Sequence, residues 1–210
     1  MSTVKRYFLL LFSLCLFSIN ALALAPETGW ISNLNHLHVK VNLQLTGQAQ
    51  QNTANALLNV NLDTDWKTYW RSPGEGGVAP TFEWKAESTN IKAFDWSWPT
   101  PKRYPVLGVE TVGYKDKIHF PLHITVNDPE QSSRLKGTLT LASCTTICVL
   151  TDYKIDLRFD LSQLSINENI AFAYAQAVSS VPILVNQSAI DTKKNNANIT
   201  HITSSWDQFN

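Results

Sequence analysis

The segment LASCTTICVL occupies residues 141–150 and holds Cys144 and Cys148 inside an apolar, β-branched run. Such a run is typical of a strand that is buried at least on one face. Residues 135–142 before the cysteines are also strand-like. In residues 153–159, which follow, apolar side chains alternate with polar ones. The region therefore predicts two strands that flank a cysteine-containing segment.

The rest of the chain up to about residue 163 also reads as strands separated by turns. Strand patterns occupy residues 36–45, 56–62, 82–84, 91–98 and 118–126. Pro121 interrupts the last of these, so we expect that strand to lie at a sheet edge or to carry a bulge. Residues 102–117 contain one Pro and two Gly and predict a long irregular connection. Short strands without an intervening helix predict an all-β sandwich over residues 30–163.

The two ends of the chain differ from this domain. Residues 1–23 have the pattern of a cleavable signal peptide: Lys5 and Arg6, an apolar run over 7–17, and a small-residue cleavage site at 21–23. Residues 166–182 are rich in Ala and predict one short helix. Residues 183–210 are polar and Asn-rich, and we expect a linker or the start of a second β domain. This abrupt end favours a fragment of a longer protein.

Removal of the signal peptide changes two properties of the chain. Cys15 is lost, so Cys144 and Cys148 are the remaining cysteines, and they meet an oxidising compartment. The remaining 15 basic and 17 acidic residues give a net charge of −2. Basic residues do not cluster, so the sequence does not predict nucleic-acid binding.

Three interpretations of the cysteine pair are open on the residues alone. In an extended strand the two Cα atoms would lie about 13 Å apart, whereas a disulfide needs about 4.4–6.8 Å. A disulfide therefore requires a tight turn at residues 145–147. A bond that closes so small a loop stabilises a fold by only about 2 kcal/mol. A redox pair is therefore favoured over a structural bond, although no charged residue adjoins the cysteines to show which sulfur attacks.

The third interpretation is a metal site. Thiolates suit Cu(I), and histidines at a distance in the sequence would complete such a site. His36 and His38 would share one strand face, as would His119 and His123 if Pro121 does not shift the register. Histidines in these patterns are more often ordinary surface or core residues. The segment 102–117 is a candidate cover for an exposed dithiol.

Several motifs together resemble a known family. They are WKTYWRSPGEGG at 66–77, WPTPKR at 98–103, GVETVGYKD at 108–116, and the pair Cys144 and Cys148. In this order they resemble the N-terminal periplasmic domain of the DsbD/ScsB transmembrane thiol–disulfide reductases. The ScsB branch, which is linked to copper tolerance, is the nearer match. The resemblance covers about residues 30–165 and the helix that follows.

The resemblance implies an immunoglobulin-like sandwich in which Cys144 and Cys148 cycle between dithiol and disulfide, without cofactor or metal. The protein would then be a periplasmic protein-disulfide reductase component, tethered to the inner membrane if it is part of a longer chain. A membrane-embedded electron-transfer domain or subunit would supply electrons. The acceptors would be periplasmic thioredoxin-like or disulfide isomerase proteins and cytochrome c maturation factors.

Two features of the chain depart from that family or have no assigned role in it. The sequence lacks the family's membrane helices and its C-terminal thioredoxin-like domain, so either the chain is a fragment or a separate membrane subunit feeds it. Tyr69, Trp70 and Arg71 match a family motif, for which packing is the favoured role. The alternative function is a non-enzymatic copper-binding or protein-binding β-sandwich with a structural disulfide.

Overall fold

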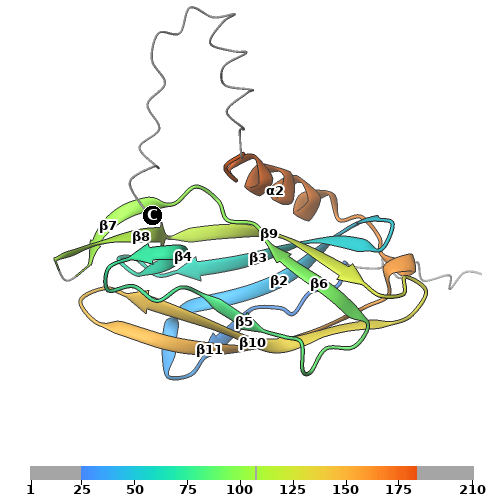
Figure 1. The fold of residues 1–210 in the computed structure, drawn as a ribbon, viewed down its shortest axis with the longest axis horizontal. Helices are drawn as coiled ribbons and strands as arrows, with labels where there is room; N and C mark the ends of the chain where they lie inside the picture. The colour runs from blue at the N-terminus through green and yellow to red at the C-terminus, as the bar shows by residue number, and fades with distance from the viewer. Residues whose placement is uncertain (1–24, 107, 184–210) are drawn as a thin grey trace, which may run out of the picture.

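Two antiparallel sheets pack face to face in the computed structural model, which describes residues 25–106 and 108–183 (Figure 1). The first sheet has the strand order β1 (Ile31–Asn33), β2 (His36–Gln50), β3 (Thr53–Leu62), β9 (Lys117–Val126) and β6 (Ile91–Trp96). The second has the order β11 (Cys148–Phe159), β10 (Ser133–Cys144), β4 (Lys67–Gly74), β8 (Val109–Lys115) and β7 (Lys102–Val106), while β5 (Thr81–Glu83) pairs with β10. The predicted all-β, immunoglobulin-like sandwich is confirmed.

The core lies between the two sheets and is built by the inward side chains of alternating positions. In β10, Leu135, Leu139 and Leu141 are at most 1% exposed, and they meet buried residues of β2, β3 and β9. Cross-strand neighbours in β11 alternate in the same way, with Tyr153 and Leu157 buried. Full burial of one such side chain stabilises the fold by about 1.5–3 kcal/mol. The core therefore anchors β10 and β11 firmly, up to the end that carries the cysteines.

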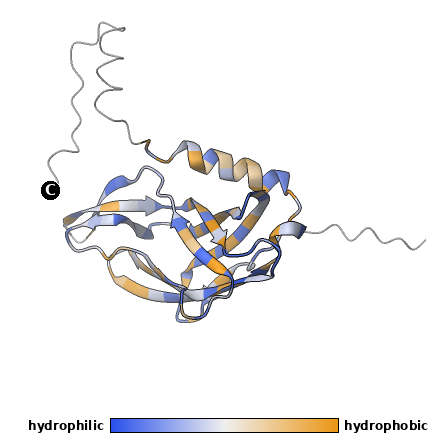
Figure 2. Ribbon diagram, turned by 45° about the vertical axis from the view of Figure 1, so that its right-hand side comes forward, coloured by the Kyte–Doolittle hydropathy of each residue, from blue (hydrophilic) through white to orange (hydrophobic). Residues whose placement is uncertain are grey.

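A single helix covers the outer face of the first sheet. After the short 3₁₀ turn η1 (Leu161–Gln163), α2 spans Glu168–Ser179 and lies outside the sandwich (Figures 1 and 2). The Asn167 side chain caps α2 by accepting a hydrogen bond from the Ile170 N–H. Tyr174 and Ala177 pack on Leu57 of β3. No helix in the described part of the chain is long and apolar enough to cross a membrane; the predicted signal peptide and nearly all of the segment 183–210 lie outside the described residues.

The strand at 118–126 is not an edge strand, and the register shift in its pairing with β6, between Ile91 and Ala93, lies away from Pro121, which corrects the prediction from Pro121. β9 lies between β3 and β6, and its pairing with β3 runs unbroken from Lys117 to Thr125. The Pro121 carbonyl accepts a hydrogen bond from the Ser97 N–H, so the proline nitrogen also faces the β6 side. β6 ends at Trp96, opposite Leu122. The missing N–H therefore falls just past the end of the neighbouring strand, where no ladder bond is lost.

Residues 102–117 are not an irregular connection, which corrects a second prediction. β7 and β8 form a hairpin whose pairs run from Lys102 and Gly113 to Val106 and Val109. Pro105 is tolerated because β7 is the outermost strand of its sheet. Glycine is needed at position 113 because β8 and β4 approach each other closely there. A Cβ atom at this position would clash with the Thr68 carbonyl oxygen of β4.

Candidate redox site

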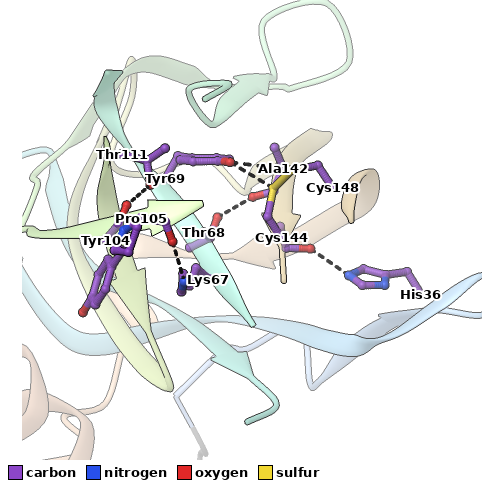
Figure 3. The surroundings of a disulfide bond; sticks show 11 residues. His36, Lys67, Thr68, Tyr69, Tyr104, Pro105, Thr111, Ala142, Cys144 and Cys148 are labelled. Carbon is purple, nitrogen blue, oxygen red and sulfur yellow. Dashed lines mark hydrogen bonds between the residues drawn. A yellow bond between two sulfur atoms is a disulfide. The ribbon is translucent and has the colours of Figure 1, made fainter. Parts of the chain in front are cut away.

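The two cysteines face each other at the tip of the β10–β11 hairpin. β10 ends at Cys144, β11 begins at Cys148, and the two residues are the last cross-strand pair. The turn between them is closed by a hydrogen bond of 2.9 Å from the Thr145 N–H to the Ile147 carbonyl. The sulfurs form a disulfide, with the Cα atoms 4.1 Å apart (Figure 3). The predicted turn at residues 145–147 is therefore confirmed.

The two sulfurs differ in access. Cys144 is completely buried, whereas Cys148 is exposed. Ile147 and Leu150, on either side of Cys148, are 61% and 62% exposed. A thiol or disulfide of another molecule can therefore reach the sulfur of Cys148 and not that of Cys144.

Tyr69 of β4 contacts both sulfurs. Its hydroxyl lies 2.9 Å from Cys144 Sγ and 3.8 Å from Cys148 Sγ (Figure 3). Burial raises the pKa of Tyr69 above its ordinary value, so the phenol keeps its proton near neutral pH. A protonated phenol can donate a hydrogen bond to a thiolate of the opened disulfide. Tyr69 is packed, as the favoured interpretation predicts, and its hydroxyl also contacts the sulfurs, which makes it a candidate site residue.

The neighbours of Tyr69 in the same motif do pack as expected. The Trp70 ring packs against the hydrophobic core. The Arg71 guanidinium lies 5.0 Å from the centre of that ring, a distance at which cation–π attraction operates. The alternation of the strand explains the difference, because Tyr69 and Trp70 point to opposite faces.

The β7–β8 hairpin contributes to the buried surroundings of Cys144. Val106 packs with Tyr69, Ala142 and Cys144 in a small apolar cluster that is separate from the main core. The Lys67 ammonium group, from β4, donates a hydrogen bond of 3.0 Å to the Pro105 carbonyl beside Val106 (Figure 3). The segment 102–117 is the predicted cover, and it contributes Val106 to the cluster that contains Cys144.

A histidine lies behind the site, on the inward face of β10. His36 is 5% exposed, and its Nε2 shares a 2.7 Å hydrogen bond with the hydroxyl of Ser143, the residue before Cys144. The His36 ring also contacts the edge of Trp66, on which His38 is stacked, and His38 Nδ1 lies 3.0 Å from Asp63. Burial, and next the charge of His38, lower the pKa of His36, while Asp63 acts in the opposite direction. His36 is therefore favoured in its neutral form.

The histidines considered as copper ligands do not assemble with the cysteines. His119 Nδ1 bonds to Asn59 at 2.6 Å, and His123 Nε2 bonds to the Tyr174 hydroxyl at 3.0 Å; both lie on the other sheet. Among the described residues, no group of three or more His, Cys, Asp or Glu side chains lies close enough to hold a metal ion. The geometry therefore gives no support to the copper interpretation.

Comparison with known proteins agrees with this geometry. The family model for the N-terminal part of the thiol:disulfide interchange protein DsbD matches residues 37–160, which is more than half of the chain. The chain belongs to this family. The DsbD N-terminal assignment confirms the resemblance found in the sequence, and with the Cys144–Cys148 bond it supports a thiol–disulfide exchange domain.

A solved structure also resembles this DsbD N-terminal domain. The crystal structure of the N-terminal periplasmic domain of ScsB from Proteus mirabilis is 33% identical and superposes with a TM-score of 0.64. The match covers 77% of this chain and 62% of that one, so the chain spans less than two thirds of its relative. No curated protein sequence matches the chain.

Neither Tyr69 nor His36 was assigned to the site from the sequence. They lie 75 and 107 residues from their partners Cys144 and Ser143. The family motif did single out Tyr69, and that was the available signal for it. His36 was considered only as a possible metal ligand, because it is the packing of one sheet on the other that brings it behind the cysteine.

Proposed function

We propose that this domain performs thiol–disulfide exchange in the periplasm through Cys144 and Cys148. It passes reducing equivalents from a membrane-embedded electron-transfer domain or subunit to periplasmic thioredoxin-like or disulfide isomerase proteins. The observation that carries the proposal is the asymmetry of the disulfide, with one sulfur exposed and the other buried against Tyr69 and Val106. A purely structural disulfide has no need of an accessible sulfur.

The chemistry follows from that asymmetry. In the reduced domain, the Cys148 thiolate attacks one sulfur of a partner disulfide, and the other partner sulfur leaves as a thiolate. Cys144 then attacks Cys148 Sγ, which restores the Cys144–Cys148 bond and releases the first partner sulfur as a thiolate. Two electrons pass from the domain to the partner. Reduction by the electron carrier is the reverse sequence and again begins at Cys148.

Two neighbours assist the buried cysteine in this scheme. The Tyr69 hydroxyl donates to the Cys144 thiolate and stabilises the charge, because hydrogen bonds to ions are stronger than those between neutral groups. Val106 keeps foreign thiols away from Cys144, so that Cys144 reacts mainly with its neighbour Cys148. The cover therefore favours the intramolecular step over side reactions.

Single cysteine variants test the order of attack. Reduced Cys144→Ala, which keeps the exposed Cys148, should trap an oxidised thioredoxin-like protein as a stable mixed disulfide visible on a non-reducing gel. Reduced Cys148→Ala should trap little or none. If neither variant forms a mixed disulfide, the exchange function is wrong. A reduction potential well below about −300 mV for the wild type would instead mark a structural bond.

A further inference from the structure

Three lysines lie near the disulfide on the face of the second sheet that carries it. Lys67 is the cross-strand neighbour of both Cys144 and Lys115, so these residues form one row that continues to Cys148. Lys102 pairs with Gly113, which in turn pairs with Tyr69. Paired residues of antiparallel strands share a face of the sheet. We call Lys67, Lys102 and Lys115 the lysine cluster.

The charge of the lysine cluster is mostly uncompensated. In the described part of the chain, ion pairs join His38 to Asp63, Arg134 to Asp156 and Lys136 to Glu87, and none includes a cluster lysine.

The partners of the cluster lysines are mostly uncharged. The ammonium groups of Lys67 and Lys115 lie 5.8 and 5.0 Å from the Tyr104 ring centre. Asp116 lies near enough to Tyr104 to add to the rise in its pKa that burial causes first. The three ammonium groups outnumber this carboxylate, which favours a positive surface.

The opposite end of the same sheet shows the contrast. There the guanidinium of Arg134 binds the Asp156 carboxylate through two nitrogens, and Lys136 pairs with Glu87. Paired charges project little field into the solvent, whereas the lysine cluster does. Two ion pairs of the described residues thus lie at that end of the sheet, whereas the lysine cluster beside the disulfide has none.

On its other side the disulfide is bordered by apolar residues. Ile147 and Leu150 are largely exposed on either side of Cys148. A surface with the reactive sulfur between an apolar border and a basic cluster is suited to one kind of partner. Apolar contacts hold the two sulfurs together in the complex, while opposite charges speed the encounter.

We propose that the physiological thiol partner is a protein whose reactive cysteine is flanked by apolar side chains and, on one side, by carboxylates that face the lysine cluster. Across the row from Cys148 to Lys115, three strand spacings of about 4.8 Å place the nearest acidic groups roughly 10–14 Å from the partner sulfur. The proposal rests on the exchange function above and specifies which partners that function serves.

Two synthetic peptides test the proposal. Each has one cysteine capped as a mixed disulfide with 2-thiopyridine, a leucine beside the cysteine, and four charged residues on one side. These are Glu in the acidic peptide and Lys in the basic one. The Cys148 thiolate of the reduced chain attacks the peptide sulfur and releases 2-thiopyridone, which is followed by its absorbance. Cys144 then displaces the peptide thiol and re-forms the domain disulfide.

The expected result is a charge preference that salt removes. At an ionic strength of about 0.01 M the Debye length is about 30 Å. There the acidic peptide should react at least about 10-fold faster than the basic one. At about 1 M, where that length is about 3 Å, the ratio should approach one. The double variant Lys102→Glu/Lys115→Glu should reverse the preference at low salt.

A matched variant controls for total charge. Lys85→Glu/Lys92→Glu makes the same charge change at exposed positions of the segment after β5 and of β6, far from the cysteines, and should keep the wild-type preference. Equal rates for both peptides with the wild type at low salt would overturn the partner proposal while leaving the exchange function intact. Release from neither peptide would overturn the exchange function, and this proposal with it.

Discussion

The two hairpins that meet at the disulfide are built very differently. The β10–β11 hairpin is paired without a break from Ser133 and Phe159 to Cys144 and Cys148, and its inward side chains form much of the core. The β7–β8 hairpin has five pairs at the edge of the sheet, and its buried contact with the site is made by Val106. The first therefore fixes the sulfurs in place. The second lies at the edge of the sheet, and we expect its tip to limit access to Cys144.

Tyr69 lies where the two hairpins meet, so its removal gives the largest expected effect on the site. Tyr69→Phe keeps the ring against Val106 and removes the hydroxyl near Cys144. A hydrogen bond to a charged group stabilises it by about 1.5–3 kcal/mol. The thiolate fraction of Cys144 at neutral pH should therefore fall by a factor of about 10–100.

This change can be measured from the thiolate absorbance near 240 nm against pH, in a reduced background of Cys148→Ala. Tyr153→Phe is the matched control, because Tyr153 is equally buried and its hydroxyl donates to the Val39 carbonyl in the core instead. Tyr153→Phe should leave the Cys144 titration where it is. A Tyr69→Phe titration that coincides with that of the parent would show that the hydroxyl does not stabilise the thiolate.

Opening the cover gives an intermediate effect. Val106→Ala removes the side chain that packs on Cys144 and Tyr69. In the reduced Cys148→Ala background, iodoacetamide should then alkylate Cys144 several-fold faster. The free energy of unfolding should fall by only about 1 kcal/mol, because Val106 lies in the small cluster beside the site and not in the main core.

Val112→Ala in β8 is the control for the cover. Val112 pairs with Arg103, and this pair lies on the opposite face of the hairpin from Val106 and Val109. It should leave the alkylation rate of Cys144 unchanged. Equal alkylation rates in Val106→Ala and its parent would mean that the hairpin does not limit access, and the difference between the two hairpins would then be one of stability only.

The same contrast explains what the sequence could predict. The alternation in residues 153–159 depends on local period alone, and it correctly predicted β11. The role of a proline depends on where a neighbouring strand ends, so Pro121 and Pro105 were misread as breaks. The turn between Cys144 and Cys148 follows from the span of four residues. Tyr69 joins the site through strand pairing and His36 through the packing of the two sheets, and a single sequence contains neither.

The smallest expected effect is on the stability of the β10–β11 hairpin, which His36 contacts through the Ser143 hydroxyl. Because folding lowers the pKa of His36, the unfolded chain binds more protons once the pH falls below about 6.5, the ordinary histidine value. Stability should therefore be full above that pH and should decline as the pH falls from about 6.5 towards the lower pKa of the folded state. His119 contributes with the same sign, since burial, and next Lys117, lower its pKa too.

The substitution His36→Gln separates the two histidines, because glutamine keeps a hydrogen-bonding group near Ser143 and does not titrate. Urea unfolding of the oxidised chain at pH 7.5 and pH 5.5 should show a smaller loss of stability in the variant than in the wild type. His119→Gln should remove its own share independently, since β3 separates the strands of the two histidines and they bond to different partners, His119 to Asn59 and His36 to Ser143. The carboxylates of Glu87 and Asp156 have lowered pKa values and so act at a more acidic pH. An unchanged loss in His36→Gln would mean that His36 is protonated as readily in the folded chain as in the unfolded one, and that β10 does not depend on its neutral form.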